Sequence, residues 1–231
     1  MPDHYAEVYQ KYADRYEALV AREDHEGNIL ATLRQIAPLE GRDIIDSGAG
    51  TGRLACLVAP FARSLRVYDS SAHMLQVATA RLRALGMTHW HTEVADHRQL
   101  PAEDQSADIV LAGWSVVYTV VWEEHWRTEL SKALAELTRV LRPGGKLIIL
   151  ETLGTGFVTP HPPEGMLPYF AYLEHEAGFT RSWIRTDYRF ASVEEARELT
   201  SFFFEDDMTD RLLSLDPPIL PECTGIWERS A

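Results

Sequence analysis

Three glycines and an aspartate stand close together in the stretch DIIDSGAGTGR, at residues 43–53. Gly48, Gly50 and Gly52 follow a short apolar run and precede a helical pattern, so the backbone can turn sharply there and a ligand can approach without meeting a side chain. A dinucleotide fingerprint, GxGxxG, needs its third glycine where this chain has Arg53, and the Lys-Ser/Thr pair of a P-loop is missing. The spacing therefore weakens both phosphate-binding interpretations.

Acidic residues stand near the ends of three successive predicted strands, at Asp46, Asp69 and Asp96. Asp46 favours a cationic amino group or sulfonium, because charge-assisted hydrogen bonds are strong at a partly desolvated site. Asp69 is placed to accept both hydroxyls of a ribose. Asp96 can accept from the exocyclic amine of adenine while the backbone N–H of His97 donates to the ring. Because parallel strands end at one edge of a sheet, these groups predict a ligand with an adenosine and a positively charged tail.

Strand-like and helix-like patterns alternate from about residue 41 onward, which predicts an α/β fold with a doubly wound, mostly parallel sheet. We predict strands over 44–47, 65–68, 89–94, 107–112 and 146–151, and helices over 53–61, 71–85 and 129–141. Further along, the patterns predict helices over 167–177 and 192–203, a strand over 181–190 and a final strand around 224–227.

The N-terminal segment carries aromatic residues at helical spacing. One helix face collects Tyr5, Tyr9, Tyr12, Tyr16 and Leu19. Such a face usually packs against other apolar residues, but here it can also fold over the open crevice. We therefore expect residues 1–40 to be an N-terminal helical lid, with Tyr9, Tyr12 or Tyr16 touching the ligands. Residues 41–231 then form the core, with a variable substrate-side segment over about 153–217.

Three adjacent aromatic residues occur late in this segment, at Phe202, Phe203 and Phe204. They cannot share one face of a helix. Some of them must therefore meet a cap, a partner subunit or a substrate pocket.

Composition and charge limit the partners. The formal net charge of −13 over 231 residues repels a phosphate backbone, so we expect no nucleic acid. No window reaches the roughly 18 apolar residues of a membrane helix, and the polar start does not resemble a signal peptide, so we expect no membrane and a cytoplasmic protein. Two distant cysteines and scattered histidines predict neither a disulfide nor a metal site. The remaining expectation is a small-molecule substrate and a monomer or homodimer.

Four stretches in order resemble the class I S-adenosylmethionine-dependent methyltransferases. They are DIIDSGAGTGR, VYDSSAHML at 67–75, VADHRQLPAEDQSADIVLAGWS at 94–115 and LTRVLRPGGKLIILE at 137–151. The resemblance covers roughly residues 40–152 and is far more specific than the glycines alone. It implies a seven-stranded sheet in the order 3-2-1-4-5-7-6, with strand 7 antiparallel. It also implies S-adenosyl-L-methionine as cofactor and S-adenosyl-L-homocysteine as product.

The resemblance also assigns site residues. Near the methionine part of the cofactor it places Asp46, Gly48, Ala49, Gly50 and Gly52. It makes Asp69 the ribose ligand, with Ser70 and Met74 beside the adenosine, and it makes Asp96 and His97 the residues that recognise adenine. It places Ala112, Gly113 and Trp114 at the methyl-bearing end. Asp69 could instead cap the following helix, and Asp96 could be a turn residue. Ser47 departs from the family, where a larger apolar residue is more usual, and we expect it to point into the core.

The implied reaction is methyl transfer to a small molecule, an in-line displacement that requires alignment and exclusion of water. A base is needed only for a protonated nucleophile, and the candidates are His161, His175, Tyr118 and Glu151. After the fourth strand the chain reads AGWSVVY, which is not the Asp/Asn-Pro-Pro-aromatic motif that clamps a flipped base. Two alternatives stay open: a non-catalytic S-adenosylmethionine-binding sensor or partner subunit, and, more weakly, an NAD-binding oxidoreductase.

The ribose assignment can be tested at Asp69. Because hydrogen bonds to a charged group contribute about 1.5 to 3 kcal/mol, Asp69→Ala should weaken binding of S-adenosylhomocysteine by that amount. Isothermal titration calorimetry measures the change. An unchanged affinity would mean that the ribose is held elsewhere.

Overall fold

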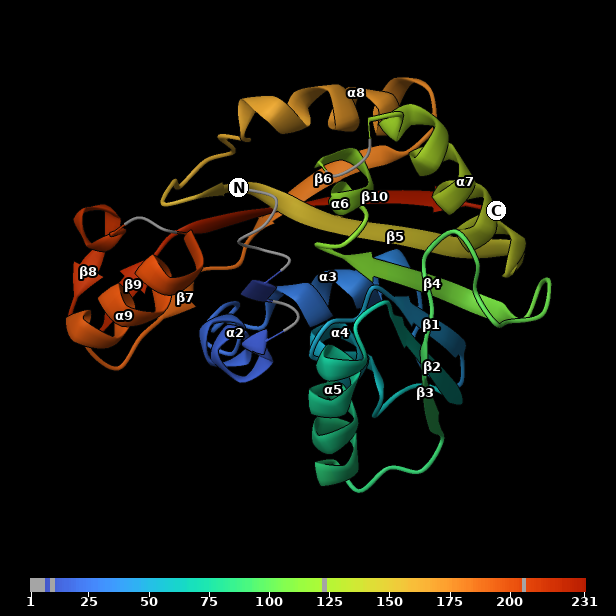
Figure 1. Ribbon diagram of the computed structural model, residues 1–231, viewed down its shortest axis with the longest axis horizontal. Helices are drawn as coiled ribbons and strands as arrows, with labels where there is room; N and C mark the ends of the chain where they lie inside the picture. The colour runs from blue at the N-terminus through green and yellow to red at the C-terminus, as the bar shows by residue number, and fades with distance from the viewer. Residues whose placement is uncertain (1–6, 9–10, 122–123, 205–206) are drawn as a thin grey trace.

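The computed structural model describes residues 7–8, 11–121, 124–204 and 207–231, and its centre is a seven-stranded sheet (Figure 1). The strand order is β3-β2-β1-β4-β5-β10-β6. These strands are β1 (Asp43–Ser47), β2 (Ser64–Asp69), β3 (Trp90–Val94), β4 (Ala107–Gly113), β5 (Leu141–Thr155), β6 (Thr180–Arg185) and β10 (Glu222–Ser230). β1 to β5 pair in parallel, whereas β10 runs antiparallel to both β5 and β6. Because β10 is the last strand of this sheet along the chain, the predicted order and the antiparallel seventh strand are confirmed.

Helices cover both faces of the sheet, and the alternation of side chains along β1 shows why. Ile44 belongs to an apolar cluster with α3 (Asn28–Ile36), α4 (Arg53–Val58) and α5 (Ala72–Ala84). Its neighbour Ile45 belongs to the cluster on the opposite face, which includes α7 (Trp126–Arg139) and α8 (Leu167–His175). All five residues of β1 are buried, as expected for a central parallel strand. This burial fixes the strand that carries the glycine loop.

The predicted boundaries needed two corrections in the core. β5 begins at Leu141 rather than at 146, and the residues 142–145 that predicted a turn lie inside it. The register shows how, because Ala107 pairs with Leu141 while Ile109 pairs with Lys146. The extra residues of β5 bulge out between these two pairs, so the turn signal marks an irregularity within a strand. The first core helix is also shorter than predicted, since α4 ends at Val58.

A second, small sheet was not predicted from the sequence. It has the order β7-β9-β8 and consists of β7 (Tyr188–Arg189), β9 (Pro218–Leu220) and β8 (Ser214–Leu215). The predicted strand over 181–190 divides between the two sheets, and the Asp187 carboxylate stands at the division. It pairs with the Arg185 side chain at 2.6 Å and accepts from the backbone N–H of Glu222 at 3.0 Å. The hydrogen bonds of Asp187 therefore interrupt a segment whose alternating pattern predicts a single strand.

Two helices distant in sequence pack together beside this small sheet. α2 (Ala13–Val20) and α9 (Val193–Phe204) share an apolar cluster with it, in which Leu19 is fully buried. Figure 1 shows α2 between α9 on one side and α4 and α5 on the other. Tyr5 and Tyr9 of the predicted stripe lie outside the described residues, and the division of the chain at residue 40 remains a prediction. In the described part of the chain, no helix has the length and apolar character needed to cross a membrane.

The remaining elements are short: α6 (Val117–Val121), and two 3₁₀ turns, η1 (Glu164–Met166) and η2 (Thr209–Arg211). α6 directly follows the end of β4 and packs against α7. This arrangement brings residues after β4 over the carboxyl edge of the sheet.

Gly52 allows α4 and α5 to approach each other. It has φ +80°, and a Cβ atom built there would lie 2.9 Å from the Cβ of Ala78 in α5. Gly52→Ala should therefore lower the free energy of unfolding by about 2 to 4 kcal/mol, through left-handed strain and overpacking together. Gly86→Ala is the matched control, because Gly86 has φ +70° with no atom within 4 Å of that Cβ position. Urea unfolding should show a cost of only about 1 to 2 kcal/mol for the control, and equal costs would contradict the packing role.

Candidate functional site

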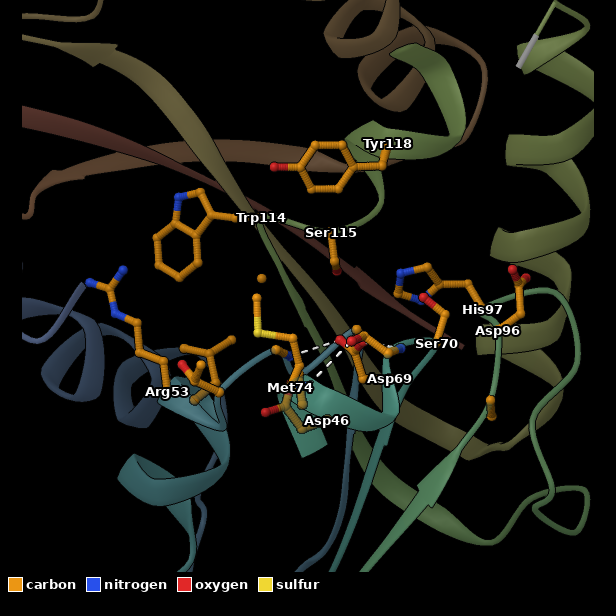
Figure 2. Close-up of a pocket in the computed structure, with 18 of the residues that line it drawn as sticks. Asp46, Arg53, Asp69, Ser70, Met74, Asp96, His97, Trp114, Ser115 and Tyr118 are labelled. Carbon is orange, nitrogen blue, oxygen red and sulfur yellow. Dashed lines mark hydrogen bonds between the residues drawn. The ribbon is translucent and has the colours of Figure 1, made fainter. Parts of the chain in front are cut away.

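A cavity of about 490 Å³ opens at the carboxyl edge of the large sheet, within the size range of small-molecule sites (Figure 2). It collects most of the predicted site residues: Asp46, Gly48, Ala49, Gly50, Asp69, Ser70, Met74, Asp96, His97, Gly113, Trp114, Tyr16 and Tyr118. It also has lining residues that the sequence did not single out: Thr51, Arg53, Leu54, Ser71, Ala72, His73, Ala95, Arg98, Ser115 and Thr119.

The glycine loop forms the floor of this cavity. Gly48 has φ +68°, and a Cβ atom there would lie 2.7 Å from Cε1 of His97 and would also overlap the side chain of Ser115. A side chain at this position is therefore excluded by backbone conformation and by space. Beside Gly50, by contrast, no atom lies within 4 Å of the Cβ position. The loop thus leaves its free space next to Gly50.

Asp69 links the ends of β1 and β2. Its carboxylate accepts hydrogen bonds from the backbone N–H of Gly50 at 2.8 Å and of Ser71 at 2.7 Å. Ser71 itself caps α5 by accepting from the N–H of Met74. Burial raises the pKa of Asp69 above its usual value, although the two backbone donors oppose this. Asp69 therefore shapes the loop and also lines the cavity.

Asp46 is the most deeply buried carboxylate of the cavity, with 1% of its surface exposed. Its Oδ2 accepts from the backbone N–H of Ala55 at 2.8 Å, whereas its Oδ1 has no hydrogen-bond partner among the described residues. Burial raises the pKa of Asp46 to about 7, and the negative charge of Asp69 adds to the effect. A buried acceptor of this kind requires a donor from a ligand or water, and a cationic group fits it best.

Asp96 and His97 lie at one side of the cavity (Figure 2), and both already have protein partners. The carboxylate of Asp96 pairs with the guanidinium of Arg98 at 2.8 Å, which holds the pKa of Asp96 below its usual value. Nδ1 of His97 lies 2.8 Å from Oγ of Ser47, and burial lowers the pKa of His97 to about 4. The Ser47 side chain therefore points to His97 and helps to hold this lining residue in place.

Arg53 and Trp114 form the opposite side (Figure 2). The guanidinium of Arg53 stacks over the indole at 4.3 Å, and its Nη1 pairs with Glu23 at 2.7 Å. Trp114 has φ +49°, a left-handed conformation that is uncommon for a bulky residue and that often marks a functional site. From the sequence, Arg53 was identified only as the residue that replaces the third glycine of a dinucleotide fingerprint.

Several predicted residues do not line the cavity. Gly52 faces α5, Ala112 is fully buried, and Tyr12 contacts the ring of Phe202 at 5.9 Å. Tyr9 lies outside the described residues.

The four proposed bases are also dispersed. Glu151 is buried and does not line the cavity; it accepts from the N–H of Val117 and from Tyr169 Oη, and burial raises its pKa to about 8. His161 stacks on Phe157 at 4.1 Å, and His175 lies at the end of α8. Tyr118 is the one of the four that lines the cavity. Over the described residues, no three His, Cys, Asp or Glu side chains gather to hold a metal ion.

Comparison with protein families and relatives agrees with this geometry. Residues 45–149 match the family model described as a methyltransferase domain. The chain is 35% identical over 119 residues to the ubiquinone/menaquinone biosynthesis C-methyltransferase UbiE of Rubrivivax gelatinosus, covering 52% of this chain and 43% of that protein. It is 30% identical over 151 residues to the malonyl-[acyl-carrier protein] O-methyltransferase of Serratia marcescens, covering 65% and 53%. The chain thus spans about half the length of these curated relatives.

Solved structures share the fold. The phosphoethanolamine N-methyltransferase 2 of Haemonchus contortus, in complex with S-adenosyl-L-methionine, superposes with a TM-score of 0.63 at 16% identity, covering 99% of this chain and 59% of that one. This likeness extends over the whole chain, including the segments outside residues 45–149.

The buried charge of Asp46 predicts a pH-dependent stability. Because the pKa of Asp46 is about 7 in the folded protein and near 3.8 unfolded, the folded state binds this proton more tightly, and Asp46 destabilises the fold progressively as pH rises from about 4 to 7. Asp46→Asn should therefore be more stable than the wild type at pH 8, by on the order of 2 kcal/mol, and similar at pH 4.

Urea unfolding at both pH values measures this difference. Glu103→Gln, at an exposed carboxyl that does not line the cavity, is the control and should show no such divergence. If the stability difference between Asp46→Asn and wild type were the same at both pH values, the pKa of Asp46 would not differ between the folded and unfolded states, and the prediction would be wrong.

Proposed function

From the methyltransferase domain at residues 45–149 and its class I fold, we propose that the chain transfers the methyl group of S-adenosyl-L-methionine to a small-molecule acceptor. One observation carries this proposal. The cavity combines a buried, unpartnered carboxylate oxygen of Asp46 with the carboxylate of Asp69, at the ends of two adjacent strands. This pair suits a ligand with a cationic amino acid at one position and a ribose at the next.

The residues of the cavity bind and orient in this proposal. Asp46 holds the ammonium of the aminoacyl tail, Asp69 accepts from the ribose, and the side with Asp96 and His97 receives the adenine. S-adenosylmethionine supplies a methyl group on a positively charged sulfur. The nucleophile of the acceptor attacks the methyl carbon in line with the carbon–sulfur bond, and S-adenosylhomocysteine leaves. The protein's contribution is alignment of the reacting groups and exclusion of water, so no covalent intermediate is needed.

The adenine end differs in one respect from the sequence interpretation. Because the Asp96 carboxylate is paired with Arg98, an exocyclic amine must share that acceptor or bind elsewhere. His97 is neutral near pH 7, since its pKa is about 4, so its ring can contact adenine without a charge. We therefore assign adenine recognition to His97 more firmly than to Asp96.

The acceptor enters, in this proposal, on the side of Trp114, Ser115 and Tyr118. Tyr16 of α2 also lines the cavity, which supports a lid role for that helix. The relatives are named for transfer to carbon and to oxygen, and the structural neighbour for transfer to nitrogen, so they do not select the acceptor atom. Tyr118 is our candidate if a base is used. A cytoplasmic location, the absence of nucleic-acid and membrane partners, and a monomeric or homodimeric state remain predictions.

The alternative is a protein that binds S-adenosylmethionine without catalysis, as a sensor or partner subunit. It is favoured by the positions of the proposed bases, because only Tyr118 of the four lines the cavity. Binding measurements do not distinguish the two functions, whereas formation of S-adenosylhomocysteine does.

Calorimetry with S-adenosylmethionine, S-adenosylhomocysteine and NAD tests the proposal first. We expect the first two to bind and NAD not to bind, because the loop has Arg53 where a dinucleotide site needs glycine. A screen of small molecules with labelled S-adenosylmethionine then measures methyl transfer. Failure of both adenosyl ligands to bind would overturn the proposal, and binding without turnover across the screen would favour the sensor.

A further inference from the structure

Two side chains of opposite charge that line the cavity each have a buried polar atom without a hydrogen-bond partner among the described residues. These atoms are Oδ1 of Asp46 and Nη2 of Arg53. Leaving a buried polar group without a hydrogen bond is unfavourable, and more so when the group is charged, so each of these atoms needs a partner. The notable feature is the combination, because the ionised carboxylate of Asp46 can only accept hydrogen bonds and the guanidinium of Arg53 can only donate them.

Arg53 is held in place by groups outside the cavity floor. Its side chain is 14% exposed, and its Nη1 pairs with Glu23, whose side chain is 4% exposed. The guanidinium lies 4.3 Å over the ring of Trp114, a residue in the left-handed conformation. A guanidinium presents donors in a rigid fork, so anchoring Nη1 fixes the direction in which Nη2 donates. Arg53 is therefore a preorganised donor whose Nη2 has no hydrogen-bond partner among the described residues.

Asp46 is positioned from the same short stretch of chain. Its Oδ2 accepts from the N–H of Ala55, two residues after Arg53. The two side chains are therefore tied to one turn of backbone, and they remain separate from each other because Arg53 pairs with Glu23 instead. An amino-acid group carries an ammonium and a carboxylate on a single carbon, and it matches this arrangement of one free acceptor and one free donor.

We propose that Arg53 binds the α-carboxylate of the methionine tail while Asp46 binds its ammonium, so that the two residues clamp the zwitterion. The inference rests on the proposed function, because it concerns the same ligand. It assigns a binding role to Arg53, the residue at the position where a dinucleotide-binding loop has its third glycine. A carboxylate brought by the methyl acceptor is the competing source, and the experiment distinguishes it.

The test compares ligands that differ by one group. Calorimetry measures S-adenosylhomocysteine and its decarboxylated amine, S-adenosyl-3-thiopropylamine, on the wild type and on Arg53→Lys. Arg53→Lys keeps the charge opposite Glu23 but loses the fork. We expect Arg53→Lys to weaken the binding of S-adenosylhomocysteine by about 10- to 100-fold, within the range for hydrogen bonds to charged groups. The affinity for the decarboxylated amine should stay nearly unchanged. The double variant Arg53→Met with Glu23→Gln, which leaves no unpaired charge, should behave in the same way.

Arg34→Met is the matched control. Arg34 also stacks on an aromatic ring, at 4.0 Å over Phe61, and pairs with a carboxylate, at 2.6 Å from Glu40, but it does not line the cavity. It should leave the affinity for both ligands unchanged. Thermal unfolding without ligand verifies that each variant is folded.

The outcomes separate the possibilities. Equal weakening of both ligands by the Arg53 variants would overturn the inference, because Arg53 would then act only on the shape of the cavity. Unchanged binding of both would also overturn it and would leave the guanidinium for an acceptor carboxylate. Absence of S-adenosylhomocysteine binding to the wild type would instead overturn the proposed function itself, and the inference with it.

Discussion

The site depends on one buried carboxylate at the end of the central strand. Asp46 lies in β1, where every residue is buried, and it cannot reach bulk water. The N–H of Ala55 satisfies one oxygen and so fixes the entry of the chain into α4. The second oxygen is left to the cavity. A protein that only needed this turn could use a neutral side chain, so the charge is a stability cost that makes sense if a cation completes it.

The other polar groups show how far the cavity is organised in the absence of a ligand. Asp69 receives two backbone N–H groups, His97 is held by Ser47, and Arg53 is held by Glu23 and Trp114. Each of these side chains is oriented before a ligand arrives, so less conformational entropy is lost on binding. The strongly paired Asp96 is the exception, because its Arg98 partner competes with any ligand.

Sequence reasoning succeeded where a local pattern has one structural solution. The glycine loop, the buried strand before it and the acidic residues after successive strands predicted most of the cavity floor. The strand order came from the resemblance of four stretches to class I methyltransferases. Sequence reasoning failed where contacts between residues distant in the chain determine the local structure. The alternating pattern over 181–190 predicted one strand, but Asp187 pairs with Arg185 and accepts from the N–H of Glu222. The segment divides there between the two sheets. Arg53 was overlooked because its role arises from Glu23 and Trp114, which lie far from it in the chain and become neighbours only in the fold.

The cover of the cavity follows from the same distinction. Every lining residue except Tyr16 lies between Asp46 and Thr119, inside the region that matches the methyltransferase domain. Tyr16 comes from α2, and its ring contacts Phe203 of α9 at 5.4 Å, while Phe202 meets Tyr12 and the guanidinium of Arg15. The adjacent phenylalanines thus meet the tyrosine helix, which answers the question that their spacing raised. This α2–α9 contact lies outside residues 45–149, so the match to the methyltransferase domain accounts for the floor of the cavity but not for its cover.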